Sequence, residues 1–191
     1  MTRRPLGKLR IIGGEYRSRI VEFVDGEGVR PTPDRVRQTL FDWLAPRIEG
    51  AAVLDLFAGS GALGFEALSR GAAMVSFVES GAEQARAIRE SLRKLGVEAR
   101  AEVLAEDALA VLSRAARRYD IVLLDPPYAS TLLGRALALL PPLLKPGNRV
   151  YLEWPTAQPR PELGPGWSWL REKQAGQVAY GLASFEGAGL P

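Results

Sequence analysis

The fold of this chain is decided by the stretch Leu54-Asp55-Leu56-Phe57-Ala58-Gly59-Ser60-Gly61-Ala62-Leu63-Gly64. An apolar run ends here, three glycines follow at the spacing G-x-G-x-x-G, and a helix-like segment begins. This order is typical of a strand, a tight turn and a helix whose first residues meet an adenosine cofactor. Glycines allow the backbone to approach such a ligand closely, because they have no side chain. A strand-to-helix turn without a ligand is the simpler alternative.

Strand-like and helix-like segments alternate from residue 51 onward. We expect helices at Ala62–Ser69, Glu83–Leu95, Leu109–Arg117 and about 132–140, and strands at Val53–Phe57, Met74–Val78, Ala101–Leu104, Ile121–Leu124 and Arg149–Glu153. Such alternation predicts an α/β fold with a mostly parallel sheet and helices on both faces. Two β-like runs, Trp167–Lys173 and Val178–Phe185, break the alternation and predict an antiparallel hairpin joined through Gly176.

The N-terminal part has a different pattern. Two β-like runs, Leu9–Gly13 and Tyr16–Val24, predict a β-hairpin. A helix should follow, with Thr32 as its N-cap, Pro33 at its first position and an end near Pro46.

The composition excludes several kinds of chemistry. The 191 residues include 47% hydrophobic residues, but neither cysteine nor histidine. Disulfides, Cys/His zinc sites, a Ser-His-Asp triad and a cysteine nucleophile are therefore excluded. The apolar runs are too short to span a bilayer, and the basic N-terminus lacks the apolar core of a signal peptide, so we expect a cytoplasmic protein.

Basic residues gather at the N-terminus although the formal net charge is only +3. Arginine supplies all but four of the 25 Lys and Arg residues, and it suits planar recognition of phosphates. Against one acid, Glu15, residues 1–20 carry Arg3, Arg4, Lys8, Arg10, Arg17 and Arg19. This cluster favours a partner that carries phosphates, whereas codon bias or heat adaptation can explain the overall arginine excess.

A second motif, Asp125-Pro126-Pro127-Tyr128, follows the apolar run Ile121–Leu124. Two prolines end the strand and stiffen the backbone where a carboxylate and an aromatic ring emerge. Ligands of doubly wound sheets bind outside the carboxyl ends of the strands, which places this motif at the edge that the glycines occupy. An acid and a stacking ring there could hold a planar base with an exocyclic amine. The alternative is a proline turn with a solvated Asp125.

The residues around the glycines distinguish two adenosine cofactors. Glu79 lies 20 residues beyond Gly59, where an acid binds ribose hydroxyls in either case. Asp55 suits a cationic ammonium group, which S-adenosylmethionine (SAM) carries and NAD lacks. NAD also leaves the proline motif unexplained, so SAM is the predicted cofactor. Its methyl group is already activated, and the protein mainly has to align the nucleophile with it.

Together, the two motifs resemble those of class I SAM-dependent methyltransferases that modify exocyclic amines. Within that group the chain resembles the RsmD family, the bacterial 16S rRNA guanine-N2 methyltransferases named for guanine 966. Three more blocks carry the resemblance: residues 9–14 with Arg17 and Arg19, residues 30–32 with 34–37 and 40–41, and residues 171–173 with 175–180. The likeness covers nearly the whole chain, and the terminal blocks are more specific than the glycine loop.

The resemblance implies a Rossmann-like fold with a seven-stranded sheet, in which residues 1–30 form an RNA-binding hairpin extension and residues 31–191 the methyltransferase domain. SAM would be converted to S-adenosylhomocysteine without a metal. The residues implied to contact SAM are Asp55, Phe57, Gly59, Gly61, Glu79 and Asp107; those at the guanine are Asp125, Pro126 and Tyr128; those at the RNA backbone are Arg10, Arg17, Arg19, Arg30, Arg35 and Arg37. Asp107 could equally be a helix N-cap. Gly81 departs from the family pattern, in which many members have Asp or Asn.

Two other functions remain open from the sequence. The proline motif alone does not choose the base, so an adenine-N6 methyltransferase of DNA or RNA is one alternative. A non-catalytic rRNA-binding assembly factor is the other. The expected partner is 16S rRNA, either free or within a 30S subunit or assembly intermediate. The chain is expected to be a monomer and not to bind a membrane.

Overall fold

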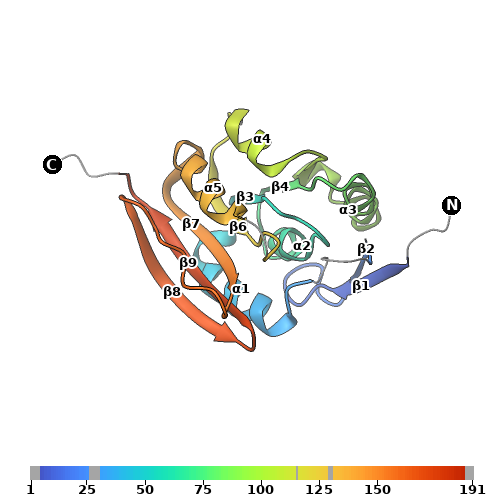
Figure 1. Ribbon diagram of the computed structural model, residues 1–191. Coiled ribbons are helices and arrows are strands. Elements are labelled where there is room, and N and C mark those ends of the chain that lie inside the picture. Colours follow the sequence, from blue (N-terminus) through green and yellow to red (C-terminus); the bar gives the residue numbers. More distant parts are fainter. Residues whose placement is uncertain (1–4, 26–30, 115, 129–130, 188–191) are drawn as a thin grey trace.

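The computed structural model describes residues 5–25, 31–114, 116–128 and 131–187, and its strands form two sheets (Figure 1). The strands are β1 (Leu6–Arg10), β2 (Ile20–Val24), β3 (Ala52–Asp55), β4 (Met74–Val78), β5 (Ala101–Leu104), β6 (Tyr119–Leu124), β7 (Leu144–Pro155), β8 (Trp167–Ala175) and β9 (Val178–Phe185). Within the described residues, β1 and β2 pair by themselves, and the other strands form one sheet in the order β5-β4-β3-β6-β7-β9-β8. Strands β3 to β7 are parallel to one another, whereas β9 runs antiparallel to both of its neighbours, β7 and β8. The predicted α/β fold with a seven-stranded, mostly parallel sheet is confirmed.

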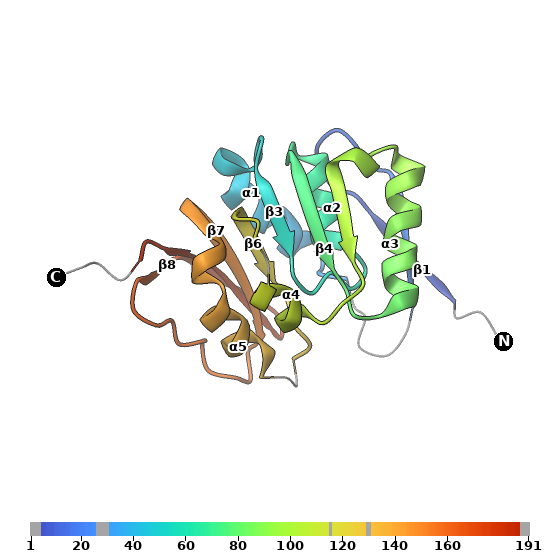
Figure 2. The same ribbon diagram turned by 90° about the horizontal axis from the view of Figure 1, so that it is seen from above.

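Helices cover both faces of the large sheet. They are α1 (Asp34–Ile48), α2 (Ala62–Ser69), α3 (Ala82–Leu95), α4 (Ala108–Arg114) and α5 (Leu132–Leu139), with short 3-10 helices at Glu98–Arg100 and Pro141–Leu143. Helices α1, α2 and α3 pack on one face and α4 and α5 on the other, and each face has its own apolar core. Viewed from above, α4 and α5 lie in front of the sheet (Figure 2).

The central strands are apolar on both faces because both are covered. In β3, Val53 belongs to one core and Leu54 to the other, as expected when successive side chains point to opposite faces. The C-terminal hairpin turns at Gly176, which has a φ of +59°. Trp167 and Trp169 pack within this part of the structure, against Phe185 and Trp154 respectively.

The N-terminal hairpin forms, but both strands differ from the predicted ones: β1 spans Leu6–Arg10 instead of Leu9–Gly13, and β2 is shorter than the sequence indicated. Strand β2 begins at Ile20 instead of Tyr16, because residues 15–18 make a turn in which Ser18 has a φ of +68°. Backbone N–H groups hold this turn against α2: Tyr16 donates to the Ser69 hydroxyl at 2.9 Å. A tertiary contact therefore replaces strand pairing at this point.

The structure corrects the predicted start of α1. Thr32 is not an N-cap: the cap position is Pro33, and no side chain caps the helix. The Thr32 hydroxyl instead donates to the Asp125 carboxylate at 3.4 Å. Pro46 lies inside the last turn, and the helix ends two residues later at Ile48.

A buried acid, Glu66 of α2, joins the hairpin to the main body. Its side chain is fully buried and accepts backbone hydrogen bonds from Ile12 at 3.0 Å and Gly13 at 2.9 Å. The guanidinium groups of Arg37 and Arg70 lie 3.3 and 2.9 Å from its oxygens. One carboxylate thus holds the hairpin, α1 and α2 together.

We expect Glu66→Ala to lower the free energy of unfolding by about 3–5 kcal/mol, because it removes the buried anionic partner of Arg37 and leaves that guanidinium only the exposed Asp34. Urea denaturation followed by circular dichroism measures this loss, with the exposed Glu98 changed to alanine as a control. A loss no larger than that of Glu98→Ala would show that the network contributes little to stability.

Candidate active site

Three neighbouring strands bring acidic residues to one edge of the large sheet. Asp55 is the last residue of β3, Glu79 follows β4, and Asp125 follows β6. Strands β4 and β6 flank β3 on opposite sides, so the order of the sheet reverses there. Ligands of doubly wound sheets bind outside the strand ends at such a reversal. The structure therefore brings the glycine loop and the proline motif to the same edge.

The three glycines after β3 have different structural roles. Gly59 and Gly61 have φ values of +51° and +78°, which side-chain-bearing residues rarely adopt. A Cβ at Gly61 would lie 2.6 Å from the Phe65 ring, and one at Gly64 would lie 2.2 Å from the Phe77 ring. At Gly59, the nearest atom to an added Cβ is 3.9 Å away. Gly61 and Gly64 thus allow tight packing, whereas the backbone at Gly59 has open space beside it.

Asp55 stabilises the glycine loop through a hydrogen bond to the backbone. Its carboxylate accepts a hydrogen bond from the Gly64 backbone N–H at 3.0 Å, and only 2% of the residue is exposed. Burial, with a smaller effect from the charge of Glu79, raises the pKa of Asp55 to about 7. The contact between Asp55 and a cationic ligand group stays a prediction.

Glu79 connects the two loops beside β3 and β4. One of its oxygens accepts from the Gly59 N–H at 2.9 Å and the other from the Gly81 N–H at 2.7 Å. A Cβ at position 81 would lie 2.9 Å from the carboxylate, so glycine favours this arrangement. Each oxygen has two lone pairs, and the partly exposed carboxylate can therefore accept further hydrogen bonds from a ligand.

Asp107 directly precedes α4, and Phe57 packs on the face of the sheet that α4 and α5 cover. Asp107 is exposed and caps α4, since one of its oxygens accepts from the Ala110 N–H at 2.9 Å. This is the N-cap alternative from the sequence, and it leaves the second oxygen for other contacts. Phe57 is partly buried against the core formed by α4 and α5.

A second buried acid, Glu153 of β7, lies beside the proline motif. It is 3% exposed and accepts from the Tyr128 hydroxyl at 2.7 Å and from the Tyr151 hydroxyl at 2.9 Å. The hydrogen bond fixes the phenol end of Tyr128, while 40% of that residue stays exposed. The Tyr128 ring is therefore a held but accessible aromatic surface.

Two acids of this site, Asp125 and Glu153, both have raised pKa values. Burial raises the pKa of Asp125 well above its usual value, and the charges of Glu153 and Asp55 raise it further. Burial also raises the pKa of Glu153, against the opposing effect of its two tyrosine hydrogen bonds. Neither acid forms an ion pair with a lysine or arginine of the described residues. Such a region suits a ligand that brings N–H donors or a positive charge.

Glu153 and Tyr151 are site residues that the sequence motifs did not predict. One signal was present: Glu153 is a lone acid in the apolar run Val150–Trp154, which β7 buries beside β6. A charged residue in a strand buried on both faces needs a specific partner. The partner could not be inferred, because Tyr128 lies in a loop of another part of the chain.

The predicted RNA-contacting arginines divide into two groups. Arg10, Arg17, Arg19 and Arg35 are exposed, and Arg30 lies outside the described residues. The prediction that Arg37 contacts RNA at the surface is wrong. Only 2% of it is exposed, and it donates to the backbone carbonyls of Thr32 and Arg10, each at 3.1 Å, as well as to acidic side chains. Its charge is used inside the protein.

Two further properties concern membranes and metals. In the described parts of the chain, each helix is too short or too polar to cross a membrane. The same residues contain no group of three or more acidic side chains arranged to hold a metal ion.

Comparisons with known proteins show the family. Residues 9–184 match the family model described as Conserved hypothetical protein 95. Ribosomal RNA small subunit methyltransferase D of Escherichia coli K12 is 42% identical over 185 residues, which cover 96% of this chain and 93% of that protein. The chain belongs to the RsmD family.

Two more relatives agree with this assignment. The Haemophilus influenzae protein of the same name is 41% identical over 92% of this chain and 93% of its own length. Among solved structures, a putative methyltransferase from Escherichia coli, yhhF, superposes with a TM-score of 0.88 at 40% identity, covering 94% of this chain and 99% of that one. Both the sequence and the fold therefore support the RsmD family assignment.

The buried Asp55 predicts a defined pH dependence of stability. The folded protein keeps a proton on Asp55 up to about pH 7, whereas the unfolded chain releases it near its usual pKa of 3.8. Stability contributed by the protonated group is therefore lost as the pH rises through this window, by up to about 1.4 kcal/mol per pH unit, and the loss ends above the folded pKa.

We expect the substitution Asp55→Asn to remove this dependence, because the amide oxygen can still accept from Gly64. Urea denaturation between pH 4.5 and 8.5 gives the difference in unfolding free energy between the variant and the original protein, both without ligand. As the pH rises to about 7, the original protein should lose stability relative to the variant. Above that pH the difference between their unfolding free energies should stay constant. A difference that is constant across the range would contradict the raised pKa.

Proposed function

We propose that this chain transfers a methyl group from SAM to the exocyclic N2 amine of one guanine in small-subunit rRNA, guanine 966 by the family resemblance. Membership of the RsmD family supports the reaction class and the RNA substrate. The observation that carries the proposal is the position of Asp125. It is a desolvated carboxylate at the carboxyl ends of the strands, where the glycine loop also begins. An exocyclic amine is the kind of group that such an acceptor can hold.

The residues of the glycine loop fit SAM. The open space beside Gly59 can accept a ligand against the backbone, and the carboxylate of Glu79 can receive both ribose hydroxyls. Asp55 would face the ammonium group, and a nearby positive charge would lower its raised pKa and favour the ionised acid. SAM supplies an electrophilic methyl group on a positively charged sulfur. Phe57, Gly61 and Asp107 complete the proposed cofactor contacts.

Asp125 would act on the acceptor amine. The lone pair of that nitrogen is delocalised into the purine ring, which makes it a poor nucleophile. Hydrogen bonds from its N–H groups to Asp125 and to the Pro126 carbonyl would orient the nitrogen and stabilise the positive charge that develops on it. The surroundings raise the pKa of Asp125, so the same carboxylate is suited to accept the proton that the methylated nitrogen releases.

Tyr128 would stack on the guanine. Its hydroxyl is held by Glu153 and its backbone carbonyl accepts from the Gln158 side chain at 3.1 Å, so the ring has little freedom to turn away. Base–aromatic stacking is worth about 1–3 kcal/mol per base. A guanine paired in a helix would have to leave its stack to reach this position.

The exposed arginines would bind the RNA backbone. Arg10, Arg17 and Arg19 belong to the N-terminal hairpin segment and Arg35 to the first turn of α1. Phosphate contacts of this kind position the RNA but do not select the base.

The reaction is tested by identifying the methylated nucleoside. The protein is incubated with SAM and hypomethylated 30S particles, 16S rRNA or DNA, and the nucleic acid is digested for mass spectrometry. We expect N2-methylguanosine at one rRNA site. The variant Asp125→Asn should bind SAM as the original protein does but lose activity by about 100-fold or more, as expected for removal of one preorganised charge-stabilising group.

An exposed acid provides the control for this variant: Asp42→Asn on α1 should keep full activity. N6-methyladenosine as the product would keep the mechanism and change the substrate. Activity of Asp125→Asn equal to that of Asp42→Asn would remove Asp125 from the mechanism, and no transfer by the original protein would favour an assembly factor.

Glu79→Gln should weaken SAM binding, because two ribose hydroxyls lose a charged acceptor and one loop amide loses its partner. Hydrogen bonds to charged groups contribute about 1.5–3 kcal/mol, so we expect an affinity loss of roughly 10- to 150-fold by calorimetry. Glu83→Gln, at an exposed position in the first turn of α3, is the matched control. Equal affinities of the two variants would place the ribose elsewhere.

A further inference from the structure

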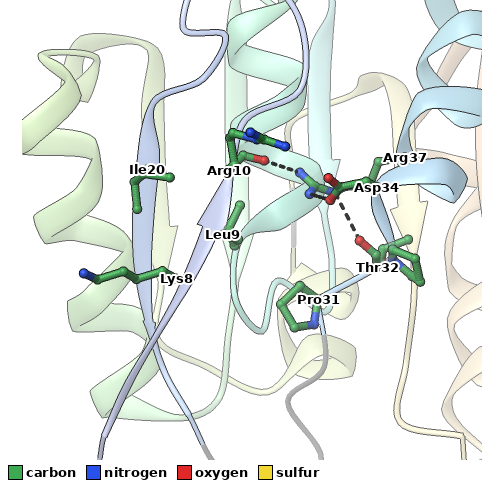
Figure 3. Close-up of a pocket in the computed structure, with 9 residues that line it drawn as sticks. Lys8, Leu9, Arg10, Ile20, Pro31, Thr32, Asp34 and Arg37 are labelled. Atoms are coloured by element: carbon green, nitrogen blue, oxygen red, sulfur yellow. Dashed lines mark hydrogen bonds and ion pairs between the residues drawn. The ribbon is translucent and has the colours of Figure 1, made fainter.

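A depression of about 450 Å³ lies between the N-terminal hairpin and the segment that leads into α1 (Figure 3). Lys8, Leu9, Arg10 and Ile20 line it from the hairpin, and Pro31 and Thr32 line it from the other side. These residues come from distant parts of the described chain, so only the folded protein has this depression.

The two sides of the depression are held at a fixed separation. The buried guanidinium of Arg37 donates to the Thr32 carbonyl with Nε and to the Arg10 carbonyl with Nη1, each at 3.1 Å. Figure 3 shows the bond from Arg37 to the Arg10 carbonyl, which joins the hairpin to the side that carries Thr32 and α1. The depression is therefore formed before any ligand arrives, which reduces the entropic cost of binding.

One side of the depression contacts the proposed acceptor site directly. Thr32 lines the depression, and its hydroxyl donates to the Asp125 carboxylate at 3.4 Å. A guanine held by Asp125 would thus have its neighbouring nucleotide within reach of the depression, since consecutive nucleotides are one phosphodiester linkage apart.

The charges of the depression suit one phosphate. The acid in its lining, Asp34, lies 2.6 Å from a guanidinium nitrogen of Arg37, so these two charges compensate each other. The guanidinium of the exposed Arg10 forms no ion pair or hydrogen bond with any of the described residues. Lys8 is exposed and lies opposite Glu22 in the strand register. The Glu22 carboxylate forms its ion pair with Lys94.

The depression also offers an apolar surface beside these cations. Ile20 is 53% exposed, although it is a large aliphatic residue, and Pro31 faces the depression with it. Isoleucine and proline are among the residues that proteins place against the faces of bases. A flat apolar body attached to an anion is the description of a nucleotide.

We propose that this depression binds the nucleotide next to the target guanine, with its phosphate at Lys8 and Arg10 and its base against Ile20 and Pro31. This inference rests on the proposed function, because it names a second contact of the same RNA. It assigns a role to Ile20 that the arginine-based description of the RNA surface does not include.

The test combines a protein variant with a change in the RNA. Equilibrium binding is measured with the rRNA stem-loop that carries the target guanine, and with versions in which the base on its 5′ or 3′ side is replaced by an abasic site. The protein variants are Ile20→Ser and, as a matched control, Leu6→Ser. Leu6 is 56% exposed on the same hairpin and does not line the depression.

We expect the abasic replacement on one side of the guanine to weaken binding by the original protein roughly 3- to 10-fold, as estimated from burying the exposed half of an isoleucine. Ile20→Ser should lose a similar factor with the intact RNA and lose little more with the abasic RNA. Leu6→Ser should behave like the original protein with every RNA. Arg10→Gln should flatten the slope of log affinity against log salt concentration by about 0.7–0.9.

Other outcomes overturn the inference in distinguishable ways. If the original protein tolerates both abasic replacements, or if the losses from Ile20→Ser and from the abasic site multiply, the depression does not hold a neighbouring base. Methylation of the intact RNA in parallel reactions would then leave the proposed function standing. If the losses are coupled but no methyl group is transferred, the nucleotide site stands and the proposed function fails. Absence of binding to the stem-loop overturns the nucleotide site, and methylation of 30S particles in parallel reactions then decides the proposed function separately.

Discussion

The buried carboxylate of Glu66 is the interaction on which the rest of this structure depends. A buried charge is tolerated only when its lone pairs are satisfied, and Glu66 satisfies them with donors from three separate parts of the chain. Glu66 lies on α2, the helix that begins directly after the glycine loop. The same helix therefore positions the loop at one end of the proposed site and anchors the hairpin that would face the RNA. Cofactor and substrate surfaces share one rigid element.

The acids at the sheet edge differ from Glu66 in their partners. Glu66 faces two guanidinium groups, whereas Asp55, Asp125 and Glu153 are held by neutral donors: a backbone amide, a threonine hydroxyl and two tyrosine hydroxyls. Neutral donors leave most of the desolvation cost in place, which is why the pKa of each of these three acids is raised. A ligand that brings N–H groups and positive charge would relieve that cost. Perturbed acids of this kind are characteristic of functional sites.

The sequence predicted those features that depend on local pattern. Apolar runs and glycines were enough for the parallel strands, the turn after β3 and the position of Asp125 at a strand end. Features that depend on tertiary contact were missed or wrong: Thr32 caps no helix but reaches Asp125. Arg37 could have been recognised as buried, because it lies three and four residues before Leu40 and Phe41 and thus on the apolar side of α1. Its partner Glu66 could not, since no local pattern links positions 37 and 66.

The hairpin also bears on how the chain divides into parts. A two-stranded sheet is marginally stable by itself in water. Here Gln84 of α3 pairs with the free edge of β2, donating to the Val24 carbonyl and accepting from the Val24 N–H, both at 2.8 Å. Together with the contacts to Glu66 and Ser69, these bonds satisfy backbone groups that an isolated hairpin would expose. The boundary near residue 30 therefore separates two proposed roles, in RNA binding and in methyl transfer, rather than two independently folding units. Because side chains of α2 and α3 satisfy these hairpin groups, any change that displaces those helices would also loosen the hairpin.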